Sequence, residues 1–275
     1  MFIDVVRLLD SIAPDRFKQG LKERYRLLEY YKTNAFSNGT EYFSQVNVET
    51  NTGCNRKCRI CPNSKSTRGQ NYISDEIYST VLQQLSSINF KGIFSTVFYN
   101  EPFLDNQLSK RIKQAKDAIP SSYLIIYTNG SLLNHDNIEE VVNAGADIIT
   151  VSQYIDNLAK DDARPTISKL PKKLKKHIRY RILDDTMALS TRAGGVDVKV
   201  PIHKNICAVA SVRAMVDYKG NVVLCTDDYY TENKLGNIMD RHILDIWNDK
   251  NYKRIRKELR QGIFSEGLCK RCAGQ

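Results

Sequence analysis

Cysteine is the residue type in this 275-residue chain with the clearest capacity for chemistry, and its seven copies fall into two sets. Cys54, Cys58 and Cys61 form the first set, with three and then two residues between them. Three thiolates on one short loop can bind three irons of a cubic four-iron cluster, which leaves the fourth iron open to a substrate or cofactor. The same spacing also suits a zinc knuckle that lacks its fourth ligand, so the three cysteines alone leave both kinds of site open.

The second set lies in the C-terminal quarter of the chain and consists of Cys207, Cys225, Cys269 and Cys272. Four cysteines that end in a C-x2-C pair can hold either a structural zinc ion or an iron–sulfur cluster. The total of seven is odd, and charged residues interrupt the N-terminal apolar stretch where a signal peptide would need a continuous apolar run. These features argue against a disulfide framework and favour metal or thiol chemistry in the cytoplasm.

The elements that must position the first cysteine set alternate between strands and helices. Strands are predicted at residues 42–48, 92–99, 123–128, 146–151 and 177–183, and helices at 74–87, 105–118, 136–144 and 167–174. This alternation predicts an α/β fold of parallel β/α units, in which polar groups gather at the C-terminal ends of the strands.

Both ends of the chain depart from this alternation. Residues 1 to about 40 are predicted to be helical, because Val5, Leu8, Leu9 and Ile12 share one face and residues 21–31 continue the pattern. After residue 200 a hairpin at 211–216 and 221–225 and helices at 243–247 and 250–261 predict a smaller α+β module. The predicted domains are therefore 1–41 (helical extension), 42–200 (core) and 201–275 (C-terminal module).

Four segments of the core follow one another in a fixed order: residues 52–64 around the first cysteines, then 99–102, 128–130 and 151–153. Over residues 45 to about 200 these segments resemble the radical S-adenosylmethionine (SAM) superfamily. The resemblance implies a partial (β/α)6 barrel similar to a TIM barrel. It also implies that Cys54, Cys58 and Cys61 hold a [4Fe-4S] cluster whose open iron binds SAM.

The resemblance further implies which residues contact SAM. Glu101 occupies the position that binds the SAM amino group, although Tyr99 and Asn100 replace the two glycines that usually precede it. Asn100 is also expected to contact SAM. The third strand ends in Thr128 and Asn129, as is common in the superfamily. The fourth strand is followed directly by Ser152 and Gln153, where contacts to the SAM ribose or carboxylate are expected.

The C-terminal module resembles the SPASM/twitch modules of radical SAM enzymes, through residues 217–225, 235–238 and 243–248 together with its cysteines. Because only four cysteines are present, the resemblance implies the shorter twitch form with one auxiliary [4Fe-4S] cluster, ligated by Cys207, Cys225, Cys269 and Cys272. Three plus four accounts for all seven cysteines. No thiol is then left to return a hydrogen atom to a substrate radical.

The expected reaction follows from this resemblance, because aminocyclitol radical SAM dehydrogenases have the same architecture of one radical SAM core and one fully ligated twitch cluster. Reductive cleavage of SAM gives a 5′-deoxyadenosyl radical that removes a substrate hydrogen atom, and the auxiliary cluster accepts an electron as an alcohol becomes a ketone. Arg192 is the candidate to bind either a substrate hydroxyl or the SAM carboxylate. His203 is a candidate proton carrier, and Tyr99 and Tyr154 are candidate pocket walls. Peptide epimerisation or crosslinking remains an alternative, as does a non-catalytic iron–sulfur or zinc scaffold.

The net charge of +10 is concentrated in two basic stretches, residues 169–181 and 250–260. They are either ordinary solvated surfaces or a docking surface for an acidic electron donor such as flavodoxin or ferredoxin. The sequence shows no recognition motif for nucleic acid. It also has no apolar run of the ~18 residues that a membrane helix needs.

Overall fold

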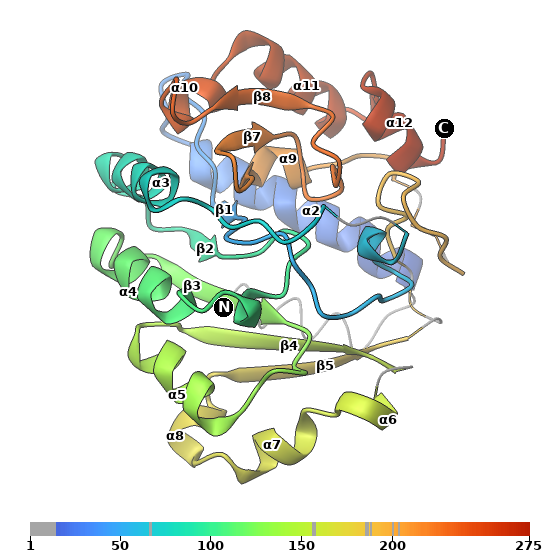
Figure 1. Cartoon of the computed structure of the whole chain (residues 1–275). Coiled ribbons are helices and arrows are strands. Elements are labelled where there is room, and N and C mark those ends of the chain that lie inside the picture. Colours follow the sequence, from blue (N-terminus) through green and yellow to red (C-terminus); the bar gives the residue numbers. More distant parts are fainter. Residues whose placement is uncertain are drawn as a thin grey trace.

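The computed structural model describes residues 15–65, 68–155, 158–184, 187, 189–199, 201–202 and 204–275. The helical face predicted at Val5, Leu8, Leu9 and Ile12, and the candidate His203, lie outside these described residues. Within them one sheet organises the chain, in the strand order β5-β4-β3-β2-β1-β6-β7-β8 (Figure 1). The strands are β1 (Gln45–Val48), β2 (Ile93–Ser95), β3 (Tyr123–Thr128), β4 (Ile148–Tyr154), β5 (Ile178–Leu183), β6 (Arg213–Val216), β7 (Asn221–Val223) and β8 (Lys234–Asn237).

The strands from β5 to β6 run parallel to one another, as the predicted partial barrel requires. Helices connect the first five of them, which confirms the predicted β/α alternation. These helices are α3 (Asp75–Ser87), α4 (Leu108–Ala118), α5 (His135–Asn143), α6 (Leu158–Asp161), α7 (Arg164–Lys169) and α8 (Lys172–Lys175). The helix predicted at 167–174 is divided between α7 and α8, because Pro171 begins a new helical turn and the residue before it is extended.

The two faces of the sheet differ in character. On one face Val46, Phe94 and Ala214, which are aligned across β1, β2 and β6, join the apolar core beneath α3. Because side chains alternate along a strand, their neighbours Gln45 and Arg213 point to the other face, which we call the inner face. In a partial barrel, the apolar face packs against the helices, and the polar inner face carries the side chains that can bind ligands.

The C-terminal module is continuous with the core rather than attached to its surface. β6 lies beside β1, and the antiparallel β7 and β8 extend the sheet. One apolar cluster includes residues of both parts, and the Trp247 ring lies 5.1 Å from the Phe43 ring. The helices of the module are α9 (Val209–Val212), α10 (Ile243–Trp247), α11 (Lys250–Arg260) and α12 (Gly267–Ala273).

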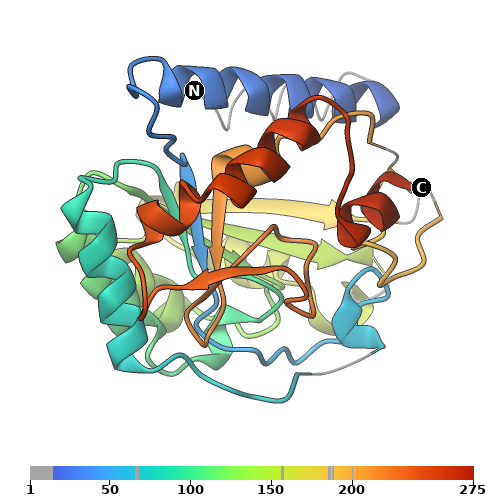
Figure 2. The same ribbon diagram turned by 90° about the horizontal axis from the view of Figure 1, so that it is seen from above.

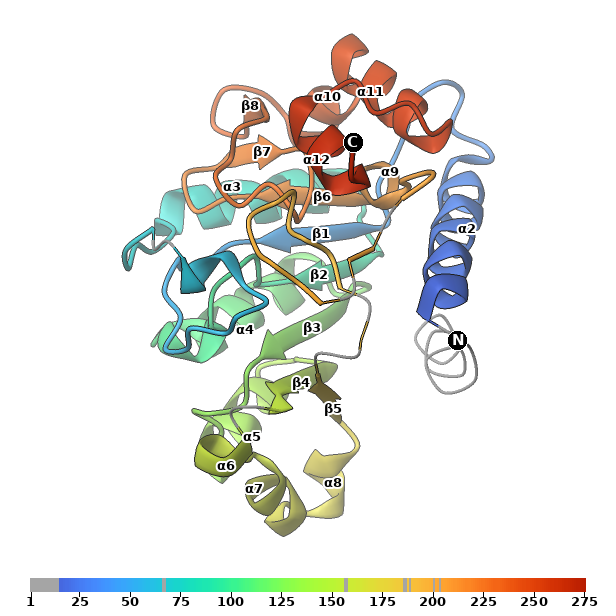
Figure 3. The ribbon, with the colours of Figure 1, turned by 90° about the vertical axis from the view of Figure 1, so that its right-hand side faces the viewer.

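A long helix, α2 (Asp15–Asn34), lies on the opposite side of the sheet from α3 (Figures 2 and 3). Its buried Glu23 accepts a hydrogen bond of 2.8 Å from the Ala208 backbone at the start of α9. At the other end of the helix, Arg260 of α11 lies 4.0 Å from the centre of the Tyr30 ring. The described part of the predicted helical extension therefore packs on the C-terminal module.

None of the described helices combines the length and the apolar character that a membrane span requires.

Candidate functional site

The loop that follows β1 carries the first cysteine set. The Cys61 amide donates a hydrogen bond of 2.9 Å to the Cys58 carbonyl, and a short 3-10 helix (Pro62–Ser64) follows directly. Burial, together with the nearby Glu101, Cys61 and Cys58, raises the pKa of the Cys54 thiol to about 11. Iron binds thiolates, so cluster assembly must displace these protons.

Glu101 lies beside this loop, fully buried, where the chain leaves the second strand. Its Oε1 accepts hydrogen bonds from the Thr128 hydroxyl (2.7 Å) and the Phe103 amide (3.2 Å), and its Oε2 accepts one from the Asn129 amide (2.7 Å). Burial raises the pKa of Glu101, and these hydrogen bonds oppose the rise. A carboxylate offers about four acceptor positions. Three are filled, so Oε2 retains one for a ligand.

The end of β3 connects Glu101 to the cysteine loop. Asn129 Nδ2 lies 3.8 Å from Cys54 Sγ and 2.9 Å from Asn55 Oδ1. Gly130 follows at φ +82°, and a Cβ there would meet the Val151 side chain at 2.7 Å. Only glycine tolerates both conditions, so the turn that directs Asn129 toward Cys54 depends on Gly130.

The other three residues expected to contact SAM do not all lie beside Glu101 and Cys54: these are Asn100, Ser152 and Gln153. Asn100 bonds within its own loop, to the Phe98 amide and the Thr96 carbonyl. Ser152 accepts a hydrogen bond of 2.7 Å from Arg181. Gln153 is fully buried and holds the segment before α7 through the Asp161 carbonyl and the Ala163 amide.

The physical reason for the position of Gln153 is the length of β4. The sequence predicts that the fourth strand ends at residue 151, but β4 continues to Tyr154. Within a strand, adjacent side chains point to opposite faces, so Ser152 and Gln153 cannot both face the inner side. Gln153 shares its face with Val151, which packs under the helices.

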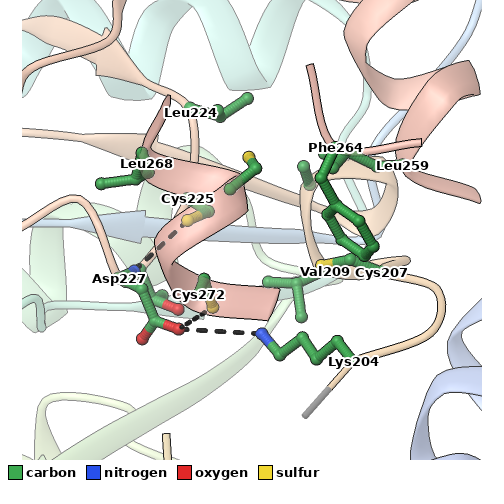
Figure 4. A pocket seen from close by; sticks show the side chains of 13 residues that line it. Lys204, Cys207, Val209, Leu224, Cys225, Asp227, Leu259, Phe264, Leu268 and Cys272 are labelled. Atoms are coloured by element: carbon green, nitrogen blue, oxygen red, sulfur yellow. Dashed lines mark hydrogen bonds and ion pairs between the residues drawn. The ribbon is translucent and has the colours of Figure 1, made fainter. Parts of the chain in front are cut away.

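The second cysteine set lines one pocket in the C-terminal module (Figure 4). Cys207, Cys225, Cys269 and Cys272 all line it, together with apolar side chains from β7 onward such as Leu224, Leu259, Phe264 and Leu268. Cys269 and Cys272 lie three residues apart on α12 and so share one side of that helix. Burial raises the pKa of Cys269 to about 12 and that of Cys272 to about 11.

Asp227 is a functional residue that the sequence interpretation missed. It lies at the rim of this pocket, 3.1 Å from Arg192 Nη1, 2.7 Å from the Ser190 hydroxyl and 3.7 Å from Lys204 Nζ. Cys272 Sγ lies 3.4 Å from Asp227 Oδ2. Burial alone would raise the pKa of Asp227, but Arg192 and Lys204 outweigh it and hold the pKa well below its usual value. The only signal in the sequence was its position two residues after Cys225.

Arg192 lies where the two cysteine sets approach each other. Its guanidinium is 5.8 Å from the centre of the Tyr99 ring, and its Nε is buried without a hydrogen-bond partner. Both Cys61 and Cys225 are close enough to Tyr99 to act on it electrostatically. Arg192 has φ +51° and Ala193 has φ +53°, a backbone region that non-glycine residues adopt mainly where the surrounding structure holds them.

Tyr99 therefore lies as a wall between the two sets. It is 91% buried, its hydroxyl has no hydrogen-bond partner, and its ring packs 5.0 Å from that of Tyr229. The second predicted wall, Tyr154, is also buried and accepts a hydrogen bond of 3.2 Å from Arg59 in the cysteine loop.

The Asp227 cluster gives a testable stability effect. Asp227→Asn should lower the free energy of unfolding by about 3 kcal/mol, because Arg192 and the buried Lys204 lose their counter-charge. Since folding lowers the pKa of Asp227, its stabilisation is complete above the ordinary carboxylate pKa and is lost as the pH falls through the folded-state pKa. Urea unfolding followed by the fluorescence of Trp247, the single tryptophan, measures both effects.

The matched control is Asp197→Asn, since the Asp197 side chain is 93% exposed and pairs with the half-exposed Lys65. This variant should leave the urea midpoint unchanged. Equal midpoints for Asp227→Asn and the wild type at neutral pH would contradict the role given to Asp227.

Comparison with known proteins agrees with this geometry. The radical SAM superfamily matches residues 48–196, and the SPASM iron–sulfur cluster-binding domain matches residues 207–273. The chain is 34% identical to the SAM-dependent 2-deoxy-scyllo-inosamine dehydrogenase of Niallia circulans, over 84% of this chain and 92% of that protein.

Solved structures of related proteins also superpose on this chain. BtrN in complex with AdoMet and 2-DOIA superposes with a TM-score of 0.77 at 34% identity, over 84% of this chain and 92% of BtrN. SuiB of Streptococcus suis bound to SAM gives a TM-score of 0.57 at 15% identity, over 91% of this chain and 76% of SuiB, which shows a shared fold. The chain belongs to the radical SAM superfamily, as an oxidoreductase that uses SAM and [4Fe-4S] clusters and carries a C-terminal SPASM domain.

Proposed function

We propose that this protein oxidises an alcohol group of a sugar or cyclitol to a ketone, with SAM as co-substrate. One observation carries the proposal: four thiols line a single pocket in the C-terminal module. A cluster held by four protein thiolates has no open iron for a substrate, so it is suited to accept an electron. The 34% identity to an inosamine dehydrogenase supports the same reaction class.

The cysteine roles follow from their placement. Cys54, Cys58 and Cys61 hold the cluster that binds SAM, and Cys207, Cys225, Cys269 and Cys272 hold the auxiliary cluster. When bound, the clusters and SAM supply reductive cleavage, removal of a hydrogen atom from an unactivated C–H bond, and uptake of one electron. The chain's own residues position these groups and the substrate.

Glu101 is the proposed partner of the SAM ammonium group. Thr128 and Asn129 hold its carboxylate in place, and one acceptor position remains. Glu101→Gln should weaken SAM binding by roughly 10- to 150-fold, the usual cost of a charge-assisted hydrogen bond, while both clusters remain. Calorimetry on the reconstituted protein measures this loss.

The matched control for that experiment is Asn100→Ala, because the Asn100 side chain bonds only within its own loop. Its SAM affinity should stay near that of the wild type. An unchanged affinity in a folded Glu101→Gln protein would show that SAM binds elsewhere.

Arg192 is the proposed partner of the substrate hydroxyl. Its Nη1 is held by Asp227, while the buried Nε is still available as a donor beside Tyr99. Asp227 is a positioning residue here: Arg192 and Lys204 keep it ionised, and a carboxylate with a lowered pKa is a poor proton acceptor.

Domain boundaries at 41 and 200 remain proposals, since β6, which belongs to the C-terminal module, continues the sheet of the core.

We also propose an acidic flavodoxin or ferredoxin as electron donor, and cytoplasmic residence. The exposed lysines of α7 and α8 support a docking surface there: Lys169, Lys172, Lys173, Lys175 and Lys176. The second basic stretch supports it less, because Arg256 is fully buried and pairs with Glu41. Association with the donor should weaken as salt is added.

The function is tested with anaerobically reconstituted protein, SAM, a chemical reductant and a panel of sugars and cyclitols. We expect a subset of these alcohols to stimulate formation of 5′-deoxyadenosine and to yield a ketone, detected by mass spectrometry. Stimulation by peptides alone, with none of the alcohols oxidised, would contradict the proposal.

A further inference from the structure

Arg213 is a charged side chain inside the partial barrel that the reaction described above does not use. It begins β6, and its strand neighbour Ala214 packs in the apolar core, so Arg213 points to the inner face of the sheet. Among the described residues its side chain has no hydrogen bond and no ion pair, and its Nε is buried without a partner. Burying a guanidinium without a counter-charge is costly.

The charges around Arg213 come from several elements. Arg26 and Glu29 face it from α2, Tyr127 from β3, and Asp227 from the C-terminal module. Neither carboxylate lies within ion-pair distance of it, and Asp227 is already held by Arg192 and Lys204. Burial lowers the pKa of Arg213, and the positive charge of Arg26 lowers it further. Among the residues that the structure describes, no carboxylate pairs with Arg213.

The same inner face presents other polar groups. Ser95 is fully buried on β2, and its Oγ has no partner. Gln45 donates a hydrogen bond of 2.9 Å to Asn47, and both lie buried on β1. Arg179 also projects from this face, on β5, and its side chain has no hydrogen bond or ion pair among the described residues. Hydroxyl and amide groups suit a polyol, and unpaired guanidinium groups suit an anion.

The position of Arg213 separates it from the SAM site. It is aligned with Gln45, at the start of β1, whereas the cysteine loop and Glu101 follow the C-terminal ends of the strands. Asp227 acts electrostatically on Arg213 and also pairs with Arg192, the residue proposed to bind the substrate hydroxyl. An anion at Arg213 would therefore belong to the substrate rather than to SAM.

We infer that the substrate carries an anionic group, a phosphoryl or carboxyl group, which Arg213 binds on the inner face beneath α2. This inference rests on the proposed function and narrows its substrate class to an acidic sugar or cyclitol. Arg213 pairs with the anion through its guanidinium, and Ser95 is in place to bond a hydroxyl group.

The test is calorimetry on the full-length, cluster-loaded protein with SAM present. The probes are myo-inositol 1-phosphate, glucuronate, the neutral scyllo-inositol and the amine 2-deoxy-scyllo-inosamine. We expect one of the two anionic probes to bind at least about 10-fold more tightly than the neutral and amine probes. Which anionic probe binds identifies the group as phosphoryl or carboxyl.

Variants locate the effect. Arg213→Gln should weaken binding of the anionic probe by about 10- to 100-fold and leave scyllo-inositol unchanged, and Arg213→Lys should restore part of the loss. Arg24→Gln, at an exposed position of α2, is the matched control and should bind like the wild type. Neutral or amine probes that bind as tightly as the anionic ones would overturn the inference. The relative affinities of the four probes for the wild-type protein test the inference even where Arg213→Gln does not fold.

Failure of this inference can be distinguished from failure of the proposed function. Oxidation of the amine probe to a ketone, unaffected by Arg213→Gln, would overturn the anionic substrate and support the dehydrogenase. Tight binding of an anionic probe that is never oxidised would support the Arg213 site and count against the dehydrogenase.

Discussion

Replacement of Cys54, Cys58 and Cys61 together by alanine should reduce formation of 5′-deoxyadenosine to background. The wild type is expected to hold two four-iron clusters, and the triple variant should keep about four of its eight irons. The three cysteines share one loop next to Glu101 and Asn129, so removing them removes both the electron source and the iron that binds SAM. Iron analysis and chromatography of the SAM products measure the two effects.

The control for this variant is the visible absorption of the auxiliary cluster, which should persist because its four ligands come from the C-terminal module. Retention of all irons, or SAM cleavage well above background, would show that the first cluster has other ligands. Colourless wild-type protein that holds stoichiometric zinc would contradict both cluster assignments.

Replacement of Cys269 and Cys272 by alanine should separate SAM cleavage from substrate oxidation. Both thiols come from one side of α12, so the variant loses half of the auxiliary ligands while the first loop is untouched. We expect about four irons to remain and SAM to be cleaved still. Ketone formation should fall to background, because the electron removed from the substrate has no acceptor.

Lys270→Ala is the matched control, since Lys270 lies on the same helix but is exposed. It should keep the full iron content and form ketone at the wild-type rate. Undiminished ketone formation in the Cys269/Cys272 variant would mean that the auxiliary cluster is not the electron acceptor.

The sequence predicted most of the core, because its strands and helices follow local patterns. β3 is found at the predicted residues, and α3 begins as expected after Ser74, whose side chain accepts a hydrogen bond from the Ile77 amide. The pairing of β6 with β1 was not predicted. These strands are far apart in the sequence, and no local periodicity encodes which strand lies beside which.

The site was predicted in part, and the differences have physical causes. Glu101 and Asn129 meet beside Cys54 because they follow neighbouring parallel strands, which is a rule that sequence order reveals. The placement of Gln153 depends on whether β4 ends before or after it, and strand ends are poorly encoded. Asp227 and Arg213 were missed because their importance comes from neighbours that only the folded chain brings together.

The central claim is a net oxidation of a carbon that bears a hydroxyl group, and the most direct test labels that carbon with deuterium. Each turnover should consume one SAM, transfer the deuterium into 5′-deoxyadenosine, and give a ketone that has lost two hydrogen atoms. In deuterated water with unlabelled substrate, no solvent deuterium should be retained at the reacting carbon. A product of unchanged composition that gains solvent deuterium at that carbon would show epimerisation and contradict the account.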